Sequence, residues 1–454
     1  MRLFLGIMCI LTFTFMSYGQ KVLTLNDAIN IALQRNTTLK KAVNNIEANK
    51  STVKAAYGNF LPTLNASASW GWSRDRKKGG GSYTLYGITI NQPDTTITSD
   101  SRSYSANIGG NLTLFDGLSD FANLSQSKNQ LKSAQLSLEN LKQNIVFQTM
   151  NLYYTVVNDQ QLLKVQEDNV KWNKRNLETI TERNKLGAVT LADVYSAQVQ
   201  EGNAQLGLIQ AKNNFETAKS NLLYYLGLNV FENYSFADSL TAQEEEMLNT
   251  NLTNEYKNMS DLVKEALDNR PDYKSAMIDV QSAEEGVTMA FSGHLPRLTG
   301  SYDYYLHSNV LHSLSDLSNS QTYSIGLTLS IPIFSGFSVE NQVEQAKVNV
   351  MNKKVDLEDL RRTINQNIQT TYLNLQAAET GLEVSKNNVK AGGENLKIAQ
   401  EKYALGSGTL LDLLTANYNY TNARTSYINS EFQYIVLNEQ LKYYLGVLNY
   451  KKFE

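Results

Sequence analysis

One unit of about half the chain occurs twice along the sequence, and this repetition limits the folds open to it. The stretch Asp27 to Leu64 matches Asp261 to Leu298 at a constant offset (261 − 27 = 234). A second series of matches keeps another constant offset (334 − 115 = 219). Its pairs include Phe115/Phe334, Gly117/Gly336, Leu186/Leu405, Gly187/Gly406, Thr190/Thr409, Asp193/Asp412 and Gly227/Gly446. The sequence therefore predicts two similar structural repeats, the first with a longer loop between Trp72 and Tyr104.

The first 20 residues have the layout of a secretory signal peptide. Arg2 precedes an apolar core, and Ser17-Tyr18-Gly19 forms a plausible cleavage site. The alternative is a membrane anchor, but the core is shorter than the ~20 residues that a spanning helix needs. Cys9, the only cysteine, lies here, so we expect no disulfide or thiol chemistry in the mature chain. We predict residues 1–20 as signal peptide, 21–230 as first repeat and 258–454 as second repeat. Residues 231–257, acidic and irregular, are expected to be a linker or an equatorial belt that wraps the outside.

Within each repeat the apolar residues change their spacing in the same order. In the first repeat, Ala28 to Asn59 has a helical pattern that ends at Leu61-Pro62. Alternating apolar and polar residues follow from Leu64 to Trp72. After a loop marked by Gly79-Gly80-Gly81 and Pro93-Asp94, alternation resumes from Tyr104 to Leu114. The second repeat has two alternating segments as well, Leu298 to Tyr304 and Tyr323 to Ile331.

These four segments run about ten residues, the length of a transmembrane β-strand. One face of each is apolar with aromatic residues, and the other is small or polar, as in strands with lipid on one side and a lumen on the other. A soluble, half-buried sheet has the same alternation. The signal peptide and the helices that follow favour the membrane interpretation. Beyond the signal, no apolar run approaches 18 residues, so we predict no transmembrane helix.

Long helices follow each pair of strands. Leu118 to Arg183 contains neither proline nor glycine and would extend on the order of 100 Å. Apolar residues recur in it every seven positions, which predicts side-by-side helix packing as in a coiled coil. The repeating positions are Leu124, Leu131, Leu138, Ile145 and Leu152, with Val343, Val350, Leu357 and Ile364 in the second copy. Glycine-centred turns at Gly187 and Gly406, each followed by a threonine suited to capping, predict antiparallel helical hairpins.

Four strands cannot close a barrel, because known membrane barrels have at least eight. Unpaired strand edges in lipid would leave backbone groups without hydrogen bonds, at several kcal/mol each. Several chains must therefore contribute strands to one barrel. A shared barrel with polar residues inside, continued by long helices, has the form of a conduit.

The order of these elements resembles that of the TolC family of outer-membrane efflux proteins. In each half of the chain, a helix ends at Leu-Pro and is followed by two strands joined by a loop. A Phe-x-Gly motif, a long helix, a Leu-Gly turn and a returning helix come next, and the resemblance rests on this order occurring twice. Its most specific piece runs from Lys402 to Leu414. It implies an α+β membrane protein, a homotrimer whose 12-stranded barrel (3 × 4) continues into a helical tunnel in the periplasm. It also implies an outer-membrane channel, gated at its periplasmic end, that works with a periplasmic adaptor and an inner-membrane pump.

The resemblance also suggests site residues at the hairpin turns. Asp193, Tyr403 and Asp412 match positions that hold the periplasmic end closed, Asp193 and Tyr403 as a pair and Asp412 in an acidic ring. The alternative for both aspartates is a capping box with the threonine three positions earlier. Gly408 and Thr415 depart from a basic residue and a second aspartate found in some members, which predicts a weaker latch. Adaptor contacts are expected at Leu186, Gly187, Leu405 and Gly406, with ordinary turn chemistry as the alternative.

Enzymatic and nucleic-acid functions have little support in the sequence. It contains no nucleophile elbow, phosphate loop or metal-ligand cluster, and we expect neither a cofactor nor a metal. His307 and His312, placed in the second surface loop, are the weak alternative for a metal site. The net charge of −3 is too balanced to favour nucleic acid. An ungated porin or a secreted coiled-coil scaffold or adhesin remain the other functions; the first would need more strands, and the second would lack the lipid-facing alternation.

Overall fold

The computed structural model describes residues 21–237, 248 and 258–453. The predicted signal peptide and most of the predicted linker lie outside these ranges. The chain divides into two compact units, and each is described by itself. Unit 1 comprises the described parts of Met1–Val43, Ser137–Asp272 and Leu360–Glu454, and unit 2 comprises Asn44–Leu136 and Tyr273–Asp359.

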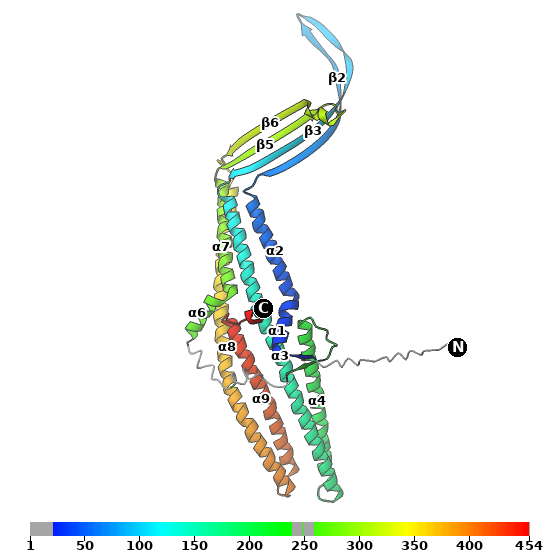
Figure 1. Cartoon of the computed structure of the whole chain (residues 1–454), viewed down its shortest axis with the longest axis vertical. Helices are drawn as coiled ribbons and strands as arrows, with labels where there is room; N and C mark the ends of the chain where they lie inside the picture. The colour runs from blue at the N-terminus through cyan, green and yellow to red at the C-terminus, as the bar shows by residue number, and fades with distance from the viewer. Residues whose placement is uncertain (1–20, 238–247, 249–257, 454) are drawn as a thin grey trace, which may run out of the picture. The chain divides into compact units, whose positions relative to one another are not determined.

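Two long helical hairpins confirm the helices expected from the seven-residue pattern. Helices α3 (Ser119–Lys185) and α8 (Ser338–Ala404) are each 67 residues long. Helices α4 (Leu191–Tyr225) and α9 (Leu410–Tyr444) are each 35 residues long and run back along α3 and α8 (Figure 1). Within the described ranges, no helix combines the length and apolar character that crossing a membrane requires.

The core of unit 1 lies where these helices pack together. Ile145 and Ile364, two positions of the predicted seven-residue stripe, are only 2% and 0% exposed. Ile145 belongs to a cluster with Val156 on the same helix, Leu222 on α4 and Ile435 on α9. Both hairpins are therefore held by a narrow apolar stripe, while most of the remaining helix surface is polar.

Each repeat begins with two helices where the sequence predicts one from Ala28 to Asn59. The structure has α1 (Leu25–Arg35) and α2 (Thr37–Gly58) in the first copy. The break falls at Asn36, whose Oδ1 accepts hydrogen bonds from the backbone N–H groups of Thr38 and Leu39 at 2.9 and 3.1 Å. The Asn36 side chain therefore caps the start of a new helix inside the stretch whose apolar spacing predicts one continuous helix.

The second copy breaks at the corresponding place for another reason. Helix α6 (Met259–Asn269) ends before Arg270, and α7 (Pro271–Phe291) begins with a proline. Proline has no backbone N–H and fits the first position of a helix, whereas in a helix interior it removes a hydrogen bond.

A short strand corrects the prediction that the linker, residues 231–257, is irregular throughout. Strand β4 (Tyr234–Phe236) pairs in parallel with β1 (Lys21–Leu23). Phe236 is buried, and its ring lies 6.1 Å from that of Tyr153 and 6.4 Å from that of Phe215. The aromatic contact fixes this part of the linker on the core of unit 1. The chain ends in a short 3-10 helix, η4 (Lys451–Phe453).

Unit 2 contains a four-stranded antiparallel sheet in the order β2-β3-β5-β6. The strands are β2 (Thr63–Leu85), β3 (Ile88–Phe115), β5 (Arg297–Ser308) and β6 (Ser320–Ser330). The register places the apolar residues of neighbouring strands opposite one another, as in the rows Ala68–Ala106–Leu306 and Ile108–Tyr304–Tyr323. One face is thus apolar and the other polar, as the alternation predicts.

The polar face is linked by side-chain hydrogen bonds. Ser67 Oγ donates to Asn107 Oδ1 at 2.7 Å, and the hydroxyls of Ser69 and Ser105 lie 2.7 Å apart. No described residue covers the apolar face: Trp70 is 66% exposed and Ile325 84%. The sheet therefore needs an apolar environment on this side.

The predicted loop between the first two strands is wrong. Strands β2 and β3 continue past the other two as a two-stranded ribbon, which turns at Tyr86 and Gly87 (Figure 1). Both turn residues have positive φ, 50° and 78°, as a two-residue hairpin turn requires. The glycine run that suggested a loop contains only a bulge, between Gly79 and Gly81.

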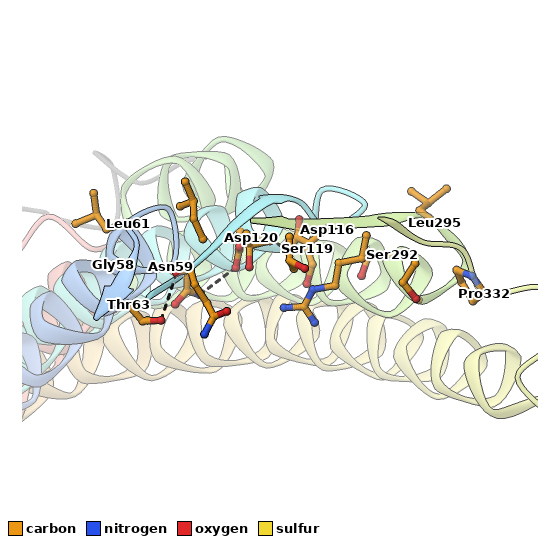
Figure 2. Close-up of a pocket in the computed structure, with 17 residues that line it drawn as sticks. Gly58, Asn59, Leu61, Thr63, Asp116, Ser119, Asp120, Ser292, Leu295 and Pro332 are labelled. Carbon is orange, nitrogen blue, oxygen red and sulfur yellow. Dashed lines mark hydrogen bonds between the residues drawn. The ribbon is translucent and has the colours of Figure 1, made fainter. Parts of the chain in front are cut away.

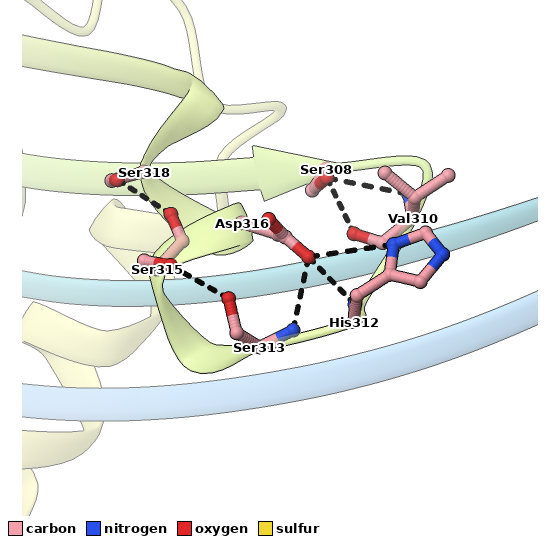
Figure 3. A network of polar contacts seen from close by, with 7 residues as sticks. All are labelled: Ser308, Val310, His312, Ser313, Ser315, Asp316 and Ser318. Carbon is pink, nitrogen blue, oxygen red and sulfur yellow. Dashed lines mark hydrogen bonds and ion pairs between the residues drawn. The ribbon is translucent and has the colours of Figure 1, made fainter.

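The second connection is short and held by one aspartate. A short 3-10 helix, η3 (Leu314–Asn319), joins β5 to β6. Figure 3 shows the Asp316 carboxylate accepting hydrogen bonds from the backbone N–H groups of His312, at 2.6 Å, and Ser313, at 3.0 Å. These two backbone donors lower the pKa of the Asp316 carboxyl. His312 therefore contributes to a structured turn.

Candidate functional site

The two hairpin turns, which carry the predicted gate and adaptor residues, have the same backbone. At the end of α3, the N–H of Gly187 donates to Asn184 O and that of Ala188 to Arg183 O. At the end of α8, Gly406 and Ser407 donate to Tyr403 O and Lys402 O in the same spacing. Both glycines have φ of +73°. This is the Schellman pattern, in which a left-handed glycine ends the helix.

The predicted aspartates close capping boxes at the start of the returning helices. The Asp193 carboxylate accepts from the backbone N–H and hydroxyl of Thr190, at 2.9 and 2.7 Å. Asp412 does the same with Thr409, at 3.1 and 2.7 Å. The hydroxyl and then the backbone N–H of Thr409 lower the pKa of the Asp412 carboxyl. The capping alternative for both aspartates is therefore confirmed.

Tyr403 lies between the two hairpins, packed against a small cluster of Ile180, Ala197 and Leu410. The Arg183 guanidinium lies 4.9 Å from the centre of the Tyr403 ring and donates to its backbone carbonyl at 3.4 Å. The Tyr403 hydroxyl is buried and has no hydrogen-bond partner among the described residues. No hydrogen bond between Asp193 and Tyr403 is found in the described part of this chain, and their pairing stays a prediction.

Arg183 was not among the predicted site residues. The available signal was its place in the last turn of a long helix, where a basic side chain favours the helix dipole. That signal says nothing of a contact with a residue 220 positions away.

Further polar contacts join α3 to α9 within one chain. Asn417 Nδ2 donates to Asn169 Oδ1 at 3.1 Å, and Arg424 donates to Asp168 at 3.1 Å. Apolar contacts accompany them, with Leu410 beside Ile180 in one small cluster. The two hairpin ends of one chain thus meet through a mixture of polar pairs and small apolar clusters.

The predicted adaptor residues lie at the exposed tips of the turns. Leu186 and Leu405 are each 83% exposed. A Cβ placed on Gly187 or Gly406 would have no neighbour within 4 Å. The positive φ explains the two glycines by turn chemistry alone, and single exposed leucines are common on protein surfaces, so the adaptor contact stays a prediction.

Unit 2 contains a hollow of about 840 Å3 where the strands meet the helices. Figure 2 shows Asn59, Asp116 and Asp120 on its wall. Asn59 donates to Asp120 at 3.1 Å, and the Asp120 N–H donates to the Asp116 carboxylate at 2.8 Å. Burial raises the pKa of the Asp120 carboxyl, and the charge of Asp116 adds to the rise. The hollow is polar and open, and these contacts account for its two aspartates.

The histidine alternative for a metal site gains no support from the geometry. His307 lies on strand β5, which corrects its placement in a loop, and its ring is stacked at 6.2 Å on that of Tyr305. His312 lies in the turn beyond the strand. Among the described residues, no group of three or more His, Cys, Asp or Glu side chains is placed to hold a metal ion.

Comparison with known proteins agrees with this architecture. The chain is 25% identical over 420 residues to the outer membrane protein TolC of Salmonella enteritidis, covering 91% of this chain and 80% of that protein. The outer membrane protein VceC of Vibrio cholerae has a similar fold, with a TM-score of 0.76, 19% identity and coverage of 93% of this chain and 96% of VceC. The CmeC outer membrane channel of Campylobacter jejuni gives a TM-score of 0.75, 18% identity and coverage of 94% and 88%.

The sequence profile of one family, outer membrane efflux protein, matches residues 28–228 and 262–447. These residues include the four-stranded sheet and both hairpins. The chain belongs to the outer membrane efflux protein family.

Proposed function

We propose that three copies of this chain form the outer-membrane channel of an efflux or secretion system, a passive duct from the periplasm to the exterior. The observation that carries the proposal is the four-stranded sheet of unit 2. One face is apolar and exposed, the other is polar, and the outer edges of β2 and β6 have no partner strand in the described chain. In lipid such edges must pair, and a closed barrel of twelve strands (3 × 4) pairs them all.

The polar face of the sheet would then line the lumen. Serine, threonine and asparagine side chains offer hydrogen bonds to water without fixing one cargo. The duct supplies no energy, so a periplasmic adaptor and an inner-membrane pump are the proposed partners. The division into repeats at 21–230 and 258–454, with 231–257 between them, stays a prediction.

The proposed gate is at the hairpin ends, where Asp193, Tyr403 and Asp412 lie. The hydrogen bonds from the Thr409 hydroxyl and backbone N–H lower the pKa of the Asp412 carboxyl, which favours the charged form that an acidic ring would use. The buried Tyr403 hydroxyl lacks a hydrogen-bond partner among the described residues of its own chain, which supports a partner in a neighbouring copy. Opening would be a shift between two packings of the hairpins. Leu186, Gly187, Leu405 and Gly406 would contact the adaptor.

Two measurements test the channel. Detergent-extracted protein is run unheated and heated on a denaturing gel, and a heat-sensitive trimer is expected from a shared barrel. A soluble monomer would instead support the coiled-coil scaffold. Single-channel conductance in planar bilayers is then compared for the wild type and Asp193→Ala/Tyr403→Phe. A small conductance that rises in the double variant supports the gate; a large, unchanged conductance supports an ungated pore.

A further inference from the structure

Along strand β2, away from the helices, the apolar face of the sheet ends in aromatic residues, and basic residues follow them on the same face. Trp70 pairs with Tyr104, and Trp72 pairs with Arg102. Because alternate residues of a strand share a face, Trp70, Trp72, Tyr104 and Arg102 lie on one side of the sheet, the side that carries Leu64. The next positions on this side of β2, beyond Trp72, are Arg74, Arg76 and Lys78.

The net positive charge of the ribbon lies on this face. We call Arg74, Arg76, Lys78 and Arg102 the outer basic patch. On this face, the stretch of β2 from Trp72 to Lys78 and the paired stretch of β3 contain one described acidic residue, Asp100. The net charge of the face there is therefore +3 (4 − 1). The opposite face of the same stretch carries Asp75 and Lys77, which cancel. The whole chain is net negative, at −3, so the patch is a local feature.

Three of the four basic side chains are available to a ligand. Arg74 is engaged, because it donates to Asp100 at 2.6 and 2.8 Å and lies 5.5 Å from the centre of the Trp72 ring. Arg76, Lys78 and Arg102 are exposed, and no salt bridge to them is found in the described part of the chain, although the charge of Arg102 also acts on Asp100. A hollow of about 490 Å3, lined by Trp70, Trp72, Arg102 and Tyr104, lies at the start of the patch.

We propose that the outer basic patch binds the phosphate-bearing headgroups of lipids in the outer leaflet of the membrane. The proposal rests on the proposed function, since this face meets lipid only in an assembled barrel. Tryptophan and tyrosine favour the depth at which the acyl chains end. Arg102 is level with Trp72, and Arg74 is about 7 Å further along the strand, at the depth of the headgroups. Guanidinium groups bind phosphate in a two-point geometry.

The fluorescence of the two tryptophans provides a local test. The chain has three tryptophans, so Trp172→Phe leaves Trp70 and Trp72 as reporters. The trimer is reconstituted with mixtures of brominated phosphatidic acid and phosphatidylcholine, whose acyl chains quench tryptophan on contact. Quenching as a function of composition gives the relative affinity of each lipid at this site. We expect phosphatidic acid to be favoured, by roughly fivefold for each unpaired positive charge nearby.

Neighbouring residues supply a matched control. Lys78→Gln and Lys77→Gln remove the same charge from opposite faces of one strand. We expect Lys78→Gln to reduce the preference severalfold, Arg76→Gln/Lys78→Gln/Arg102→Gln to abolish it, and Lys77→Gln to leave it unchanged.

Three outcomes would overturn the proposal: no preference in the wild type, equal losses for Lys77→Gln and Lys78→Gln, or displacement of the lipid by millimolar inorganic phosphate. The last outcome would assign the patch to a free anion. Conductance of the same trimers is the separate check on the proposed function. A conducting trimer without lipid preference defeats only this inference, whereas loss of both trimer and conductance defeats the channel.

Discussion

The two helical hairpins have the same backbone and different side chains. Both pair a 67-residue helix with a 35-residue helix, and both turn through a Schellman motif into a capping box. Inside the turns the side chains differ: Asn184 Nδ2 donates to Val189 O at 2.8 Å in one, and Ser407 Oγ donates to Lys402 O at 3.2 Å in the other. Both turns use the same Schellman and capping hydrogen bonds. Any functional difference between the hairpins must therefore come from residues that do not take part in those bonds.

The returning helices also end alike but in different surroundings. Gly227 ends α4 and Gly446 ends α9, with φ of +65° and +72°. A Cβ on Gly227 would meet only Arg35 Cβ, at 4.0 Å, whereas one on Gly446 would lie 3.0 Å from both the Cα and the N of Arg270. Arg270 also donates to Tyr444 O at 3.0 Å and is nearly buried. The end of the second hairpin is thus packed closely against the break between α6 and α7. The end of the first hairpin is packed more loosely against the corresponding break between α1 and α2.

The largest effect should come from Gly446→Ala compared with Gly227→Ala. Both variants place alanine in the left-handed region, at about 1–2 kcal/mol. Only Gly446→Ala adds a clash with backbone, and overpacking of this kind costs about 1–3 kcal/mol more. We expect a clearly lower midpoint of thermal unfolding, followed by circular dichroism in detergent, for Gly446→Ala. Equal shifts would mean that the close approach of Arg270 is relaxed in solution.

Removing the threonine cap should affect the start of the returning helix equally in the two hairpins. Thr190→Ala and Thr409→Ala each remove a capping hydroxyl worth about 1 kcal/mol, so amide exchange in the first turn of α4 or α9 should become roughly fivefold faster. The two variants should match. Channel conductance separates capping from gating: if the carboxylate itself gates, Asp412→Asn should raise conductance more than Thr409→Ala does. Similar rises in both would show that the gate depends on helix capping alone.

The sequence predicted what depends on local pattern. The strands, the long helices, the glycine turns and the capping aspartates each follow from periodicity or from residues a few positions apart. The ribbon beyond Ser73 was missed because Gly79–Gly81 resembles a loop, while the strand is stabilised by pairing with Thr95–Thr98 across the hairpin. The break at Asn36 depends on one side chain. The Arg183–Tyr403 contact joins residues 220 positions apart, which only the tertiary fold brings together.

A smaller effect should distinguish the side chains between the hairpins. A double-mutant cycle with Arg183→Gln and Tyr403→Leu should give a coupling of about 0.5–1 kcal/mol, the usual strength of a cation–π contact near the surface. The measurement is unfolding by urea in detergent. Tyr403→Phe keeps the ring and should leave the coupling in place. Since no described residue of its own chain bonds the Tyr403 hydroxyl, a marked loss of stability in Tyr403→Phe would reveal a partner in another copy.

The smallest effect concerns the pH dependence of the α9 cap. Because hydrogen bonds from Thr409 lower the pKa of the Asp412 carboxyl, the carboxylate form stabilises the folded helix start. This stabilisation is complete above the ordinary aspartate pKa of about 4 and is lost as the pH falls through the lower pKa of the folded state. Amide exchange at the start of α9, corrected for intrinsic rates, should therefore accelerate below about pH 4 in the wild type.

Asp412→Asn should remove this acceleration, because its side chain does not titrate, and Thr409→Ala should weaken it, because the hydrogen bonds that lower the pKa are reduced. Exchange in the middle of α9, around the buried Ile435, reports global unfolding and serves as the internal control. If both regions accelerate together in all three proteins, acid acts on the whole chain and the cap makes no separate contribution. If only the helix start responds, acid loosens the hairpin tip alone, at the residue proposed to keep the duct closed.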